Sequence, residues 1–89
     1  MNEQGQKRLR RVLKFLEDKK LLKPNIDVLD VGCGPGVYAL SFAKQARTVC
    51  ALDGAREMCA ILEDKAKQEG LNNIKVLQRM WEDVDHPNI

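Results

Sequence analysis

The stretch Val28-Leu29-Asp30-Val31-Gly32-Cys33-Gly34-Pro35-Gly36 decides how this chain of 89 residues folds. Its first residues belong to a run, 26–31, that is rich in β-branched side chains and nearly continuous in apolar character. Such a run predicts a strand covered on both faces. The three glycines that follow allow a tight turn and the close approach of a ligand to the backbone. A strand followed at once by such a turn is typical of the ligand-binding edge of an α/β sheet.

The flanking sequence predicts the remaining elements. Before the glycines, apolar residues at i, i+3, i+4 and i+7 predict an amphipathic helix from about residue 7 to residue 20. After them, the pattern favours a helix over 37–46, a buried strand over 48–53, a helix over 55–66 closed by Gly70, and a strand over 74–78. Strands that alternate with helices form right-handed βαβ units. We therefore expect an α/β fold with three parallel strands in the order 3-2-1, a basic helical region at 1–24 and a ligand-binding region at 25–89.

Composition restricts the classes of protein that fit. A chain of this length makes one small domain, and a hydrophobic content of 44% suits a packed core. No stretch approaches the ~20 apolar residues that span a bilayer, so we expect a cytoplasmic protein with no membrane partner. Charge is uneven, because residues 1–23 hold eight basic and three acidic side chains although the whole chain carries only +2. This basic helix either contacts nucleic acid or is simply a solvated face.

Few side chains could bind a metal. The chain has three cysteines and one histidine, and Cys33, Cys50 and Cys59 lack the C-x-x-C spacing of a zinc or dithiol site. We expect no metal site, and interpret Cys50 and Cys59 as small core residues.

The residues around the glycines indicate which ligand they would hold. Gly34 and Gly36 are two apart, whereas the dinucleotide fingerprint G-x-G-x-x-G separates its last two glycines by three. Asp30 would repel a pyrophosphate and attract an ammonium or sulfonium group. Asp53, at the end of the second predicted strand, can accept hydrogen bonds from both hydroxyls of a ribose. The pattern favours a cationic nucleoside over a nicotinamide dinucleotide.

These residues resemble the first motif of the class I S-adenosylmethionine-dependent methyltransferases, which has the form D-x-G-x-G-x-G after the first strand. The resemblance implies a partial, three-layer Rossmann-like methyltransferase fold with S-adenosylmethionine as its cofactor. It implies that the glycines carry the methionine part of the cofactor, that Asp30 helps to hold its amino group and that Asp53 binds its ribose. The cofactor-binding residues expected on this basis are Asp30, Gly32, Cys33, Gly34, Gly36, Asp53, Gly54, Met80 and Trp81.

The sequence departs from the family around the adenine. The family usually follows the ribose-binding acid with a bulky apolar residue that packs on adenine, but here Gly54 follows. An acid near the adenine amino group is also common, at a position aligned with Met80, and Glu82 or Asp83 could substitute for it. Trp81 either borders the adenine or covers the open end of the core.

The resemblance reaches only the first half of a family fold that has seven strands. The acceptor-selecting and catalytic residues of such enzymes lie beyond it, so both stay unassigned. A strand at 28–31 left at a sheet edge predicts a longer enzyme, a pair of copies joined along that edge, or marginal stability. Two functions remain open: the cofactor-binding portion of a methyltransferase, and a non-catalytic binding module that keeps the fold. A nicotinamide-dependent oxidoreductase is the least favoured reading.

Overall fold

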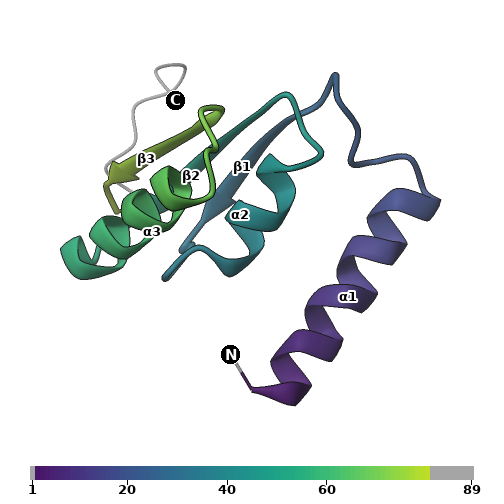
Figure 1. Ribbon diagram of the computed structural model, residues 1–89, viewed down its shortest axis with the longest axis horizontal. Helices are drawn as coiled ribbons and strands as arrows, with labels where there is room; N and C mark the ends of the chain where they lie inside the picture. The colour runs from purple at the N-terminus through teal and green to yellow at the C-terminus, as the bar shows by residue number, and fades with distance from the viewer. Residues whose placement is uncertain (1, 81–89) are drawn as a thin grey trace.

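The computed structural model describes residues 2–80, which form a three-stranded sheet, two helices packed on it and one helix set apart (Figure 1). In chain order the elements are α1 (Glu3–Asp18), β1 (Asp27–Val31), α2 (Val37–Ala43), β2 (Thr48–Asp53), α3 (Arg56–Gln68) and β3 (Ile74–Gln78). All strand pairs are parallel and β2 lies between β1 and β3, which confirms the predicted fold class and strand order.

The first helix begins at Glu3 rather than near Lys7, because Asn2 caps it. The Asn2 Oδ1 atom accepts a hydrogen bond from the backbone N–H of Gly5 at 2.8 Å. Leu13 and Leu16 pack against the core, yet α1 contains no buried residue. Within the described residues, α1 thus packs on the core through partly buried apolar side chains and has no fully buried residue of its own.

The core lies between the sheet and the two helices α2 and α3, which cover the same face (Figure 1). Val49 and Ala51 of β2 are at most 1% exposed and line the core on the side of the sheet. Leu62 of α3 is fully buried, which contributes roughly 2 kcal/mol to stability relative to an exposed leucine. Val49 and Ala51 point to this face because of the two-residue period of a strand, and Leu52, on the other face, is also only 1% exposed.

The expectation that β1 is covered on both faces is wrong for the described part of the chain. Val28 packs against the core, but Leu29 is 41% and Val31 48% exposed. Successive strand side chains point to opposite faces, and both βαβ helices cover one face only. Residues 2–80 thus supply the sheet and one helical layer of the three-layer fold.

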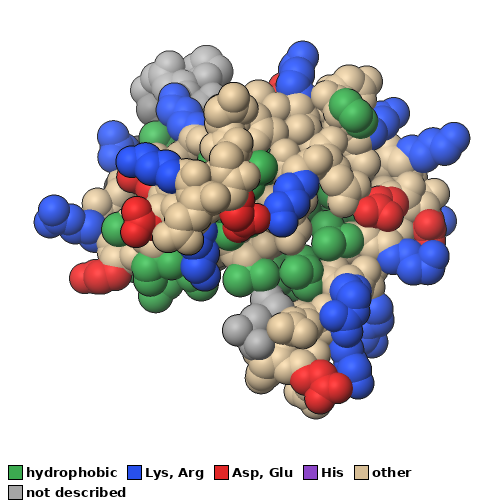
Figure 2. Space-filling model, viewed as in Figure 1, with side chains coloured by type: hydrophobic (Ala, Val, Ile, Leu, Met, Phe, Trp, Pro, Cys, Tyr) green, Lys and Arg blue, Asp and Glu red, His purple; other side chains and the backbone are tan. Residues whose placement is uncertain are grey.

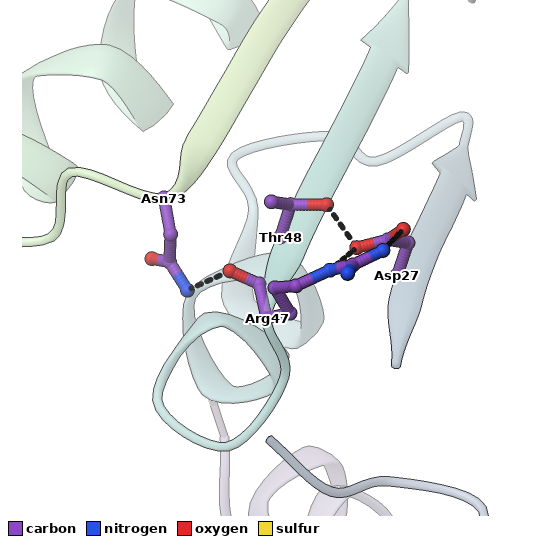
Figure 3. A network of polar contacts seen from close by, with 4 residues as sticks. All are labelled: Asp27, Arg47, Thr48 and Asn73. Carbon is purple, nitrogen blue, oxygen red and sulfur yellow. Dashed lines mark hydrogen bonds and ion pairs between the residues drawn. The ribbon is translucent and has the colours of Figure 1, made fainter. Parts of the chain in front are cut away.

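A polar network joins the amino ends of the strands (Figure 3). The Arg47 Nε atom donates to Asp27 Oδ1 at 2.9 Å, and the Thr48 hydroxyl donates to the same oxygen at 2.7 Å. The hydrogen bonds with Arg47 and Thr48 lower the pKa of Asp27 to about 2. The Asn73 side-chain amide donates to the Ala43 carbonyl at 2.8 Å. Every polar side chain of this network is engaged within the protein.

The described residues contain neither a membrane-spanning helix nor a candidate metal-binding cluster. No helix among residues 2–80 has the length and apolar character needed to cross a bilayer. Within the same residues, no three His, Cys, Asp or Glu side chains gather into a candidate metal site. Cys59 is buried and Cys50 half-buried.

Candidate functional site

The glycine loop between β1 and α2 is anchored to the adjacent strand by its backbone. The N–H groups of Gly32 and Cys33 both donate to the Leu52 carbonyl, at 2.8 and 2.9 Å. Gly32, Gly34 and Gly36 have left-handed backbones, with φ of +70°, +55° and +88°. Residues with a side chain rarely adopt this conformation, so the path of the loop requires these glycines.

The three glycines have two different roles. A Cβ atom on Gly36 would overlap the side chain of Leu62, so this glycine lets the start of α2 pack closely on α3. A Cβ on Gly32 or Gly34 would meet no atom within 4 Å. Open space therefore lies beside the backbone of Gly32 and Gly34, where a ligand can approach.

Asp53 connects the end of β2 to this loop. Its Oδ2 atom accepts the N–H of Gly34 at 2.8 Å, and its Oδ1 atom accepts the N–H of Ala55 at 2.7 Å. The structure thus brings together Asp53 and the glycines, as the sequence predicted. The direct bond to Gly34 was not predicted, because nothing in the sequence indicates that residues 19 positions apart share a hydrogen bond. Each carboxylate oxygen retains a lone pair for a further donor.

Asp30, at the end of β1, is the anomalous carboxylate of the site. Its Oδ2 atom is buried and has no hydrogen-bond partner within residues 2–80. Burial raises the pKa of this side chain, because the charged form is poorly solvated. A buried carboxylate oxygen without a partner is destabilising, and a cationic group beside it would relieve that cost.

The thiol of Cys33 lies in the negative electrostatic potential of the carboxylates around the glycine loop. Burial, followed by the charges of Asp30 and Asp53, raises the pKa of its thiol to about 11. Its Sγ atom lies 3.4 Å from the Gly34 carbonyl, to which it donates. A thiol with such a pKa is protonated at neutral pH and is not a nucleophile. The negative potential suits a positively charged ligand instead.

The segment that follows β3 supplies an apolar side chain near the end of β2. Met80 is 51% exposed, and its Sδ atom lies where a Cβ on Gly54 would stand. The Arg79 N–H donates to the Asp53 carbonyl at 3.1 Å and fixes this segment against β2. Met80 therefore covers the position that the small Gly54 leaves open, a contact that the sequence did not reveal. Trp81, Glu82 and Asp83 lie outside the described residues.

The comparison with protein families supports this reading of the fold. Residues 28–88 match a family model described as a methyltransferase domain. The chain belongs to this family. Over 71 residues it is 37% identical to a 23S rRNA (uracil(1939)-C(5))-methyltransferase of Aeromonas hydrophila, a match that covers 80% of this chain and 15% of the relative. An uncharacterized protein of Haemophilus influenzae is 39% identical over 56 residues, 63% of this chain and 21% of that protein. The chain thus spans about a fifth or less of these relatives.

Solved structures contain the same fold. A SAM-dependent methyltransferase from Aquifex aeolicus has a TM-score of 0.69 and 31% identity, with 85% of this chain and 40% of that chain covered. The YcgJ protein of Bacillus subtilis has a TM-score of 0.76 and 26% identity, with 89% and 32% covered. The predicted class I methyltransferase domain is confirmed at the level of family and fold.

Proposed function

We propose that this domain binds S-adenosylmethionine at the glycine loop and positions it for methyl transfer. The observation that carries the proposal is the buried, unpartnered Oδ2 atom of Asp30 beside an open glycine backbone. A carboxylate in that state fits an ammonium group, and it does not fit a pyrophosphate. The residues present therefore match the charge of the cofactor.

Each part of the cofactor has a proposed partner. The open backbone at Gly32 and Gly34 borders the methionine portion, whose amino group pairs with Asp30. Asp53 accepts the ribose hydroxyls through its remaining lone pairs. Met80 provides the apolar surface for adenine that Gly54 lacks. Cys33 and Gly36 shape the loop, and Trp81 is a predicted further contact.

When bound, the cofactor supplies an electrophilic methyl group for in-line displacement at carbon. That chemistry requires no nucleophile on the protein, so binding and orientation are the contributions expected of this chain. Among residues 2–80 we assign Asp30 and Asp53 to orientation, and we assign no catalytic base.

We propose RNA as the class of methyl acceptor. The support is the relatives of at least 37% identity that are named as 23S rRNA methyltransferases, from Aeromonas, Shewanella, Pseudomonas and Vibrio. Activity on RNA would belong to the whole protein.

Calorimetry on the full-length protein with S-adenosylhomocysteine tests cofactor binding. We expect micromolar affinity that falls at least thirtyfold in Asp53→Ala and stays within twofold in Asp27→Ala, a matched aspartate at the opposite end of the sheet. A folded protein that binds no S-adenosylhomocysteine would overturn the proposal in favour of a non-catalytic module. NADH binding tighter than S-adenosylhomocysteine would overturn it in favour of an oxidoreductase.

A further inference from the structure

We infer that the outer face of α1 binds the phosphate backbone of RNA. This face, the basic stripe, consists of Lys7, Arg10, Arg11 and Lys14. The inference extends the proposed function in one respect, since it takes RNA as the acceptor, and it does not depend on how the cofactor is bound.

The basic stripe is a continuous surface on one side of the helix. Its residues follow the spacing i, i+3, i+4 and i+7, so the four side chains lie on one face over roughly 10 Å of helix axis. All four are exposed, and together they line a shallow hollow of about 460 Å³. Figure 2 shows Lys and Arg side chains gathered over α1. That length matches a few consecutive phosphates of a nucleic-acid strand.

Packing does not account for these charges. The opposite side of α1 carries Leu13 and Leu16, which contact the core, and the stripe points away from it. Four cations at these spacings repel one another and destabilise an isolated helix. Nor do they serve the helix dipole, because the last turn of α1 contains no basic residue. Bound phosphates would remove the repulsion.

Internal ion pairs leave the centre of the stripe unneutralised. Lys7 lies 3.8 Å from Glu3, and Lys14 lies 3.4 Å from Asp18. Both pairs are exposed, so they contribute little to the stability of the helix. Arg10 and Arg11 form no salt bridge with any residue of the described range. Arginine presents a planar set of donors that matches phosphate oxygens, which makes this pair the centre of the proposed contact.

The stripe consists of cations alone, so it offers phosphate contacts. The exposed aromatic beside it, Phe15 of α1, lies 6.0 Å from the Lys19 ammonium nitrogen, which is placed over its ring. We therefore expect binding with little dependence on sequence. In Figure 1 the amino-terminal turn of α1 lies toward the same end of the molecule as the end of β1, where the glycine loop begins. A strand held along α1 would thus extend toward the cofactor end of the sheet.

Fluorescence anisotropy with a labelled 20-nucleotide oligouridylate tests the inference on the full-length protein. Arg10→Gln/Arg11→Gln should weaken binding at least tenfold. It should also reduce the slope of log Kd against log salt by about 1.4, since each lost single-strand phosphate contact removes about 0.7. Lys65→Gln/Lys67→Gln on α3 removes the same charge from another exposed helix and should change Kd less than twofold. Arg10→Lys/Arg11→Lys should retain most of the salt slope.

Three results would overturn the inference. One is an equal effect of the α1 and α3 double variants, and another is an unchanged salt slope in Arg10→Gln/Arg11→Gln. The third is an Arg10→Gln/Arg11→Gln variant that loses binding to phosphatidylserine-containing vesicles but still binds RNA as wild type does. That result would assign the stripe to a membrane surface. S-adenosylhomocysteine affinity should be the same in all variants, so failure here is separate from failure of cofactor binding. Circular dichroism checks that each variant is folded.

Discussion

Asp27 and Asp30 lie at the two ends of β1 and are held in opposite ways. Asp27 is exposed, accepts hydrogen bonds from Arg47 and Thr48, and has a pKa lowered to about 2. Asp30 has a buried oxygen without a partner in the described residues, and burial raises its pKa. The polar groups at the amino end of the sheet thus hold the strands together. At the carboxyl end, Asp53 accepts the N–H groups of Gly34 and Ala55, whereas the Asp30 Oδ2 atom has no partner among the described residues. We propose that the ligand binds at this end, where parallel α/β sheets bind ligands.

The largest expected effect is on stability at the carboxyl end. Gly36→Ala should lower the free energy of unfolding by about 2–4 kcal/mol, because it combines a strained left-handed backbone with a collision against Leu62. Gly70→Ala is the matched control, since Gly70 has φ of +69° but open space around it, and it should cost only about 1 kcal/mol. Urea unfolding of the full-length variants measures both. If both variants lost the same free energy of unfolding, the close packing of Gly36 on Leu62 of α3 would not contribute to the cost.

Met80→Ala should act on the ligand rather than on the fold. Loss of the apolar surface over Gly54 should raise the Kd for S-adenosylhomocysteine about five- to tenfold, equivalent to roughly 1 kcal/mol of lost contact. Ile61→Ala, which truncates another partly exposed apolar side chain, should leave Kd unchanged. If both variants bind equally well, Met80 does not contact the adenine.

The two aspartates should give opposite pH dependence of stability. Because the pKa of Asp30 is raised on folding, wild type should lose stability relative to Asp30→Asn as the pH rises above the ordinary carboxyl value of 3.8. Because the pKa of Asp27 is lowered, its contribution should be present above pH 3.8 and lost as the pH falls toward about 2. Thermal unfolding of both Asn variants from pH 2 to 8 compares them. Parallel profiles would contradict the contrast between the two ends.

The smallest expected effect concerns the amino end alone. Arg47→Gln should raise the pKa of Asp27 from about 2 part of the way toward 3.8, since it removes the Arg47 hydrogen bonds to the charged carboxylate and leaves the one from Thr48. Side-chain carboxyl resonances followed by NMR would report the shift. Affinity for S-adenosylhomocysteine should not change, and a change beyond twofold would show that the two ends are coupled.

The bounds of the strands were close to predictable from the sequence. The ranges 48–53 and 74–78 coincide with β2 and β3, because local apolar patterns and the flanking glycines mark where such strands begin and end. The prediction for β1 was accurate in position but wrong in burial. Apolar character at Leu29 and Val31 indicates a strand that can be covered, and it does not specify what covers it.

The candidate site, too, was predictable from the sequence only in part. Asp30, the glycines and Asp53 were predicted as ligand-binding residues from their order, spacing and resemblance to a family motif, and that assignment stays a prediction. The structure brings Asp53 into contact with the loop. The contact of Met80 with Gly54 and the double role of Asp53 were not foreseeable, because they join segments on neighbouring strands. The unpartnered state of the Asp30 carboxylate is likewise invisible in a sequence.

The amino-acid sequence by itself determined the order of the elements, the parallel α/β class and the chemical types gathered after β1. Periodicity, glycine conformation and charge act locally along the chain, so they can be read from neighbouring residues. The tertiary structure decided which carboxylate is paired, which is buried and which glycine faces open space. Those properties depend on atoms brought together by the packing of distant segments, and a linear pattern does not contain them.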